Sequence, residues 1–103
     1  MQKLVRDKIP EMMLKQGKVL EMRIAGSREY ELLLWRMLTD KIEEFRLNTK
    51  DEELADVLEV LRCLADHKFI KWNEVEDYRQ KKNDARGSFS KKLVIEKVEE
   101  RKM

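Results

Sequence analysis

Residues 27–67 read SREYELLLWRMLTDKIEEFRLNTKDEELADVLEVLRCLADH, and this stretch decides the fold. Apolar residues recur at helical spacing in both of its halves. We predict one helix from Ser27, as its N-cap, to about Leu47, and a second that begins near Lys50 with a capping box over residues 49–52. The turn between them is only about three residues long, which makes the two helices antiparallel neighbours.

The two helices differ in how much apolar surface they carry. The second has apolar residues along one stripe: Leu54, Val57, Leu58, Leu61, Leu64 and Ala65. The first is apolar over more than one stripe, through Leu32, Leu33, Leu34, Trp35, Met37, Leu38, Ile42 and Phe45. A helix this apolar is buried on two sides, in a bundle or at a subunit interface. The pattern alone does not distinguish these two arrangements.

Before this stretch, the sequence predicts a short helix and a connector. Asp7 can cap the helix, Pro10 suits its first turn, and Gly17 is placed to end it. Residues 18–25 alternate imperfectly between apolar and polar and indicate a connector or a short strand.

After this stretch, a capping box over residues 73–76 starts a fourth helix, which Gly87 would end. Residues 89–103 could form a docking strand, a helix or an exchanged tail. The sequence thus predicts an all-α fold: a helical bundle of four main helices with a short C-terminal extension, in a single domain that spans residues 1–103.

Composition excludes several classes of protein. The chain has 103 residues, 43% charged and 42% apolar, and its helical periodicity argues against disorder. Its 23 basic and 21 acidic residues are too balanced for an electrostatic nucleic-acid binder. With one cysteine, no apolar run long enough for a membrane and no signal-peptide core, we expect a cytoplasmic protein without a nucleic-acid or membrane partner.

Two acidic pairs are candidates for metal binding. Glu53 and Asp56 are three residues apart, and Asp40 and Glu44 are four apart, so each pair lies on one helix face. Mg²⁺ prefers oxygen ligands, and a few carboxylates usually hold it together with water and substrate phosphates. The two antiparallel helices could bring both pairs around one cation. An ordinary exposed acidic face is the commoner explanation of such spacing.

Basic residues could bind phosphate. Arg79, Lys82 and Arg86 project from one side of the fourth helix, where cationic groups can clamp polyphosphate oxygens. Arg6 and Lys8 belong to a second cluster near the N-terminus. A solvated basic face is the alternative for the first cluster, and a mobile end for the second.

Four motifs in order resemble one protein family. They are LVRDKIPE at residues 4–11, DKIEEF at 40–45, EELADVLEV at 52–60 and KNDARGSF at 82–89. This set resembles the all-α nucleoside triphosphate pyrophosphohydrolases, the MazG-like group with its phosphoribosyl-ATP pyrophosphohydrolase relatives. The resemblance implies a helical bundle that forms a homo-oligomer, a dimer or a tetramer, and binds Mg²⁺, with Mn²⁺ as a substitute. It also implies hydrolysis of a nucleoside triphosphate, canonical or non-standard, to monophosphate and pyrophosphate.

The same resemblance assigns the metal ligands. The family's ExxD motif matches Glu53 and Asp56, and its EExxE motif matches Asp40, Lys41 and Glu44. Lys41 thus stands where the family has a carboxylate ligand. A charged ammonium about 4 Å from the ion costs roughly 4 kcal/mol per unit charge at an effective dielectric constant near 20. Either Asp40 substitutes as a ligand, or Lys41 binds phosphate, or the site has lost its activity.

Further roles follow from the resemblance. Glu44 or Glu53 would act as the general base that activates water. The residues expected to bind substrate phosphates are Lys82, Arg86, Arg79, Arg6 and Lys8. The expected function is therefore a Mg²⁺-dependent nucleoside triphosphate pyrophosphohydrolase. The alternatives are a non-catalytic nucleotide-binding or regulatory oligomer of the same fold and, more remotely, a helical protein-interaction module.

Overall fold

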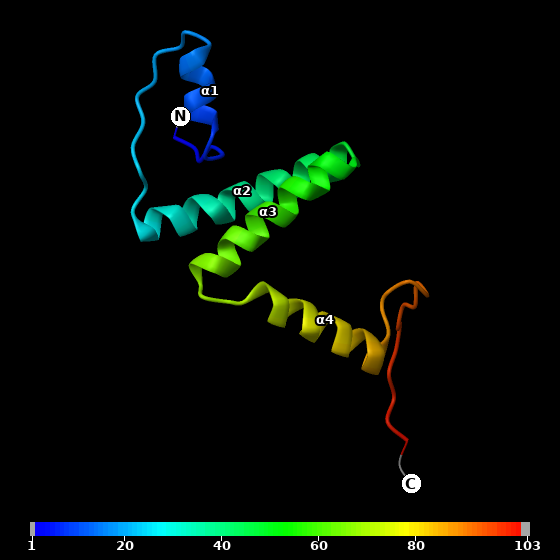
Figure 1. Ribbon diagram of the computed structural model, residues 1–103. Helices are drawn as coiled ribbons and strands as arrows, with labels where there is room; N and C mark the ends of the chain where they lie inside the picture. Colours follow the sequence, from blue (N-terminus) through cyan, green and yellow to red (C-terminus); the bar gives the residue numbers. More distant parts are fainter. Residues whose placement is uncertain (1, 102–103) are drawn as a thin grey trace. The chain divides into compact units, whose positions relative to one another are not determined.

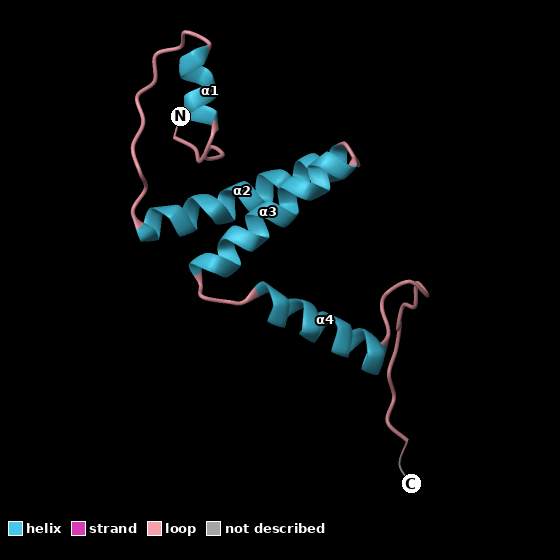
Figure 2. Ribbon diagram, viewed as in Figure 1, coloured by secondary structure: helices cyan, strands magenta, loops and turns pink. Residues whose placement is uncertain are grey.

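The computed structural model describes residues 2–101, which form four helices and no strand (Figure 2). The helices are α1 (Ile9–Lys15), α2 (Ser27–Leu47), α3 (Asp51–His67) and α4 (Trp72–Arg86), as labelled in Figure 1. The prediction of an all-α fold with four helices is confirmed. The chain divides into two compact units that join between Lys71 and Trp72. Three further points stay predictions: that the chain is a single domain, that its helices form one bundle, and that it forms an oligomer.

The first unit is built on a hairpin of α2 and α3, which run side by side in opposite directions (Figure 1). Leu34 and Leu38 of α2 pack with Val57, Val60 and Leu64 of α3. Each set repeats every three or four residues, so it forms one face of its helix. Partly buried residues complete this core: Leu4, Tyr30, Met37, Phe45 and Cys63.

The apolar stripe predicted for α3 is wrong in part. Val57, Leu64 and Ala65 are buried as expected, but so is Val60, which the predicted stripe omits. Three other members of the stripe are exposed: Leu54, Leu58 and Leu61. The sequence carries two overlapping apolar rows on α3, and α2 covers one of them.

The predicted N-caps are also wrong. Gly26 and Lys50 are the N-caps of α2 and α3, and no side chain makes a capping hydrogen bond at either position. Both have extended backbones, with ψ of 165° and 158°. Because a capping side chain must belong to that last extended residue, Ser27 lies one position too late and Thr49 one too early.

The other two helices also do not begin directly after their expected caps. Lys8 rather than Asp7 precedes α1, again without a capping side chain. Asn73 lies inside α4, which begins at Trp72. Pro10 does occupy the first turn of α1, where its missing N–H costs nothing.

Glycines end two helices as predicted. Gly17 has φ of +80°; its N–H donates to the Leu14 carbonyl at 3.0 Å and that of Lys18 to the Met13 carbonyl at 3.2 Å. These two bonds make a Schellman cap, which needs the left-handed backbone that glycine adopts without strain. Gly87 has the same φ after α4.

Phe69 occupies the corresponding position after α3. Its φ is +59°, its N–H donates to the Asp66 carbonyl at 3.1 Å, and Ile70 N–H donates to the Ala65 carbonyl at 2.8 Å. This is the same Schellman cap, but on a residue whose Cβ crowds the left-handed backbone. The side chain is 95% exposed, so burial does not offset that strain.

Phe69→Gly is therefore expected to raise the free energy of unfolding by about 0.5–1 kcal/mol. Relief of the left-handed strain raises the free energy of unfolding by roughly 1–2 kcal/mol. The greater conformational freedom of glycine in the unfolded chain lowers it again by about half of that amount. Urea denaturation followed by circular dichroism measures the change. The matched control is Lys68→Gly, one residue earlier at φ −94°, which should destabilise the protein. Equal effects of the two variants would contradict the role of φ.

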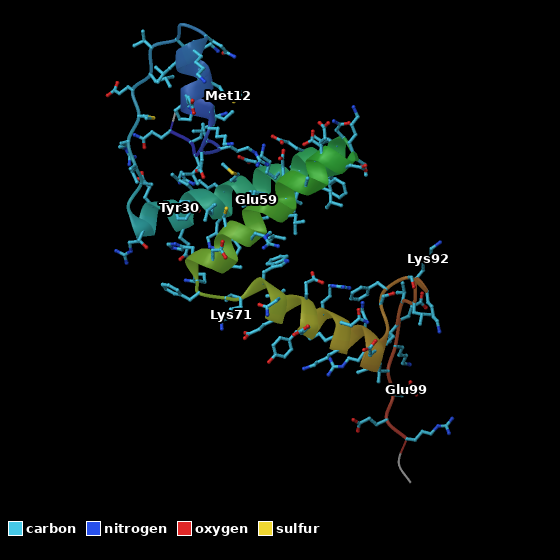
Figure 3. All side chains as sticks on the ribbon, in the orientation of Figure 1. Met12, Tyr30, Glu59, Lys71, Lys92 and Glu99 are labelled. Carbon is cyan, nitrogen blue, oxygen red and sulfur yellow. The ribbon has the colours of Figure 1, made fainter. Side chains whose placement is uncertain are left out.

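The second unit contains α4 and an extended segment. None of residues 72–101 is buried, although Trp72, Val75 and Asn83 are half-buried. The helix or strand that residues 89–103 could form is absent from residues 89–101, and residues 102–103 lie outside the described part of the chain. Figure 3 shows Lys92 and Glu99 on this segment. Residues 18–25 form an irregular connector. None of the helices among residues 2–101 combines the length and the apolar character that a membrane span needs.

Candidate functional site

Three carboxylates from two helices meet near the turn of the hairpin. Glu44 of α2 and Glu53 and Asp56 of α3 each offer one oxygen, and these oxygens lie within 4.8 Å of one another. Glu44 is in the last turn of α2 and Glu53 in the first turn of α3, so residues 48–50 bring them together. Asp56 follows Glu53 by three residues on the same helix face. The structure thus brings together three of the four predicted metal ligands.

Asp40 is not a member of this group. It lies on α2 one turn before Glu44, and its side chain is exposed. That Asp40 acts as a substitute metal ligand stays a prediction.

Lys41 lies against two of the carboxylates. Its Nζ is 3.2 Å from Glu44 Oε2 and 3.9 Å from Asp56 Oδ2. The Lys41 side chain is 29% exposed, and that of Asp56 31%. Lys41 therefore points toward the carboxylate group.

Arg6 reaches the same group from the N-terminal segment. Its Nη2 donates a hydrogen bond to Asp56 Oδ1 at 2.6 Å. Lys41 and Arg6 together offset two of the three negative charges, so the five side chains sum to one negative charge. Arg6 was predicted to bind substrate phosphate; here it pairs with a carboxylate instead.

Asn48 also contacts the group, and the sequence pattern did not predict it. Its Nδ2 donates to Glu53 Oε1 at 3.5 Å, a long hydrogen bond. Its place in the short turn next to Glu53 was the available signal. The amide can orient the Glu53 carboxylate without adding charge.

The donor set fits a hard divalent cation. Mg²⁺ and Mn²⁺ take carboxylate oxygens, and three on one side of the ion leave positions for water and phosphate oxygens. Lys41 contacts two of the same three carboxylates, so an ion bound to them would lie close to the ammonium. Exposed acidic groups are common without a metal ion, and geometry alone does not make this group a metal site.

The predicted phosphate-binding residues of α4 belong to the second unit. Arg79, Lys82 and Arg86 are exposed along this helix, and Arg79 Nε donates to Glu76 Oε2 at 3.0 Å. Lys8, before α1, is exposed as well. Their contact with a phosphate stays a prediction.

Farther from the turn, polar side chains of α2 and α3 contact one another. The rings of Tyr30 and His67 meet edge to face with centroids 5.2 Å apart. The Cys63 thiol donates to Glu59 Oε2 at 3.4 Å, and burial raises the pKa of both Cys63 and Tyr30. Figure 3 shows Tyr30 on α2 and Glu59 on α3. A thiol held in its protonated form is a poor nucleophile, so we expect low reactivity of Cys63.

No protein-family model, curated protein or solved structure matches this chain. The resemblance to the pyrophosphohydrolases therefore rests on the four motifs alone, and the function that it implies is a proposal.

Proposed function

We propose that the protein is a Mg²⁺-dependent nucleoside triphosphate pyrophosphohydrolase, which hydrolyses the bond between the α and β phosphates. The observation that carries this proposal is the convergence of Glu44, Glu53 and Asp56 from two helices to within 4.8 Å. The order of the four sequence motifs adds support, since two of them contain these carboxylates.

The proposal assigns tasks to the carboxylates and to the basic residues. The three carboxylates would hold the ion, and Glu44 or Glu53 would accept a proton from the attacking water. Bound Mg²⁺ supplies charge neutralisation on the phosphates and activation of water. The residues proposed to bind phosphate oxygens are Lys82, Arg86, Arg79, Lys8 and Arg6, the last after release from Asp56.

The test is pyrophosphate release from a panel of canonical, modified and deoxy nucleoside triphosphates, with Mg²⁺ and with a chelator. We expect release from at least one nucleotide, lost when the chelator is present. Absence of Mg²⁺-dependent release across the panel contradicts the hydrolase.

A second candidate function is a non-catalytic nucleotide-binding or regulatory protein of the same fold. The position of Lys41, 3.2 Å from Glu44 and 3.9 Å from Asp56, favours it, because the ammonium already offsets the carboxylates. This protein would bind nucleotide in calorimetry with little dependence on Mg²⁺ and no turnover. An inactive wild type whose Lys41→Glu variant releases pyrophosphate would identify a decayed site.

We also propose that the chain forms a homo-oligomer in the cytoplasm. Trp35 and Ile42 of α2 and Leu54, Leu58 and Leu61 of α3 flank the buried rows on one side of the hairpin, and each is 38–51% exposed. Helical spacing puts the carboxylate group on the opposite side. A second hairpin against this apolar side would complete a four-helix arrangement and leave the carboxylates accessible. The cytoplasm suits a chain whose single cysteine forms no intrachain disulfide.

Leu58→Asp is expected to weaken this association by at least about tenfold, or roughly 1.4 kcal/mol, because it puts a charge into the apolar interface. Sedimentation equilibrium over a concentration series measures the dissociation constant. Leu14→Asp is the control, since Leu14 of α1 is 55% exposed and lies outside the apolar side. A wild type that stays monomeric throughout the series would contradict the oligomer.

A further inference from the structure

We propose that Lys41 is an intramolecular competitor of the divalent cation, so that the ion binds well only together with a polyphosphate that takes over the ammonium. This inference rests on the proposed nucleotide hydrolase, because it assigns a task to a residue beside the proposed metal ligands. It concerns the order and coupling of binding rather than the chemical step.

The geometry puts the ammonium among the ligands. Lys41 Nζ is 3.2 Å from Glu44 Oε2 and 3.9 Å from Asp56 Oδ2, and those two carboxylates are two of the three that converge. A cation that bound these oxygens would meet Lys41 at close range. Arg6, by contrast, pairs with Asp56 alone and comes from outside the hairpin.

The length of the side chain lets the ammonium leave. Lysine carries its charge on a flexible four-carbon stem, and this one is 29% exposed, so another rotamer can turn Nζ toward solvent. Solvent offers it no anion, whereas the phosphates of a nucleotide do. Lys41 therefore disfavours a bare ion and tolerates an ion that arrives with phosphate.

Two consequences follow for the wild-type protein. The bare ion binds weakly, because it must displace Lys41 without giving it a new partner. Ion and nucleotide strengthen each other's binding. The ion displaces Lys41 from the carboxylates and frees it for phosphate, and the nucleotide gives the displaced ammonium a new anionic partner. Removal of the ammonium should weaken both effects, while the ion pair of Arg6 with Asp56 at 2.6 Å remains.

The experiment is a titration of the full chain with Mn²⁺ in the absence of nucleotide, with the free ion measured by electron paramagnetic resonance. We expect Lys41→Met and Lys41→Gln to bind Mn²⁺ at least about tenfold more tightly than the wild type. The matched control is Lys15→Met, which removes another lysine from a helical ion pair, 3.2 Å from Glu11, and should leave the affinity unchanged. Circular dichroism checks that each variant is folded.

A second titration contains a non-hydrolysable nucleoside triphosphate analogue. The analogue should increase the Mn²⁺ affinity of the wild type more than that of Lys41→Met. Equal Mn²⁺ affinity of the wild type and both Lys41 variants without nucleotide, or no Mn²⁺ binding by any of them, overturns the competition. A combined result is also informative: the Lys41 variants bind Mn²⁺ more tightly, but the wild type releases no pyrophosphate. This result supports the competition and contradicts only the proposed hydrolase.

Discussion

Leu34→Ala is expected to lower the free energy of unfolding by about 3 kcal/mol, within the usual range for a buried leucine. Leu34 is 3% exposed, the lowest fraction in the core, and packs where α2 meets α3. Domains of this size have roughly 0.05–0.15 kcal/mol of stability per residue, so the loss is a large share of the total. Urea denaturation followed by circular dichroism measures it.

The control for Leu34 is Leu47→Ala, at the end of the same helix, where the side chain is 72% exposed. This exchange should change the free energy of unfolding by less than about 1 kcal/mol. Both variants must be compared at one protein concentration, because association adds to apparent stability. If Leu34→Ala lowers the free energy of unfolding no more than Leu47→Ala does, the assignment of Leu34 to the core is contradicted.

Asp56→Asn is expected to lower kcat/KM for pyrophosphate release by at least about 100-fold, or roughly 2.7 kcal/mol of transition-state stabilisation. The amide keeps the shape of the side chain but loses the charge that pairs with Arg6 at 2.6 Å and would hold the ion. Steady-state kinetics at saturating Mg²⁺ measure the loss.

The control for Asp56 is Glu52→Gln. Glu52 also lies in α3, is exposed, and is not a member of the carboxylate group. We expect its kcat/KM to stay within about twofold of the wild type. Full activity of a folded Asp56→Asn variant would mean that hydrolysis does not use the converging carboxylates.

The hairpin and its carboxylates could be predicted from the sequence because both depend on local spacing. Periodicity located α2 and α3, and the short turn then fixed which residues of the two helices face each other. The predictions of the N-cap residues were wrong because a shift of one residue decides which side chain reaches the free N–H groups. Such a shift leaves the apolar periodicity almost unchanged, so the pattern could not reveal it.

Contacts between distant segments could not be predicted in this way. Arg6 and Asp56 are 50 residues apart, and neither residue's neighbours indicate the other. The exposed row of α3 that contains Leu58 had a related problem: an apolar residue signals burial, but its spacing does not say whether the same chain or another covers it. For Lys41 the motif gave the position, and only the structure gave the distances to Glu44 and Asp56.

The three-residue turn at 48–50 also bears on how the protein folds. α2 and α3 are consecutive helices, so the hairpin closes only a short loop at its turn. Glu44 and Glu53 meet as soon as this hairpin closes, whereas Arg6 must close a far longer loop to reach Asp56. Loop-closure entropy therefore favours assembly of the acidic group before Arg6 reaches it, and Lys41, carried on the same hairpin, offsets part of the repulsion between the carboxylates without Arg6.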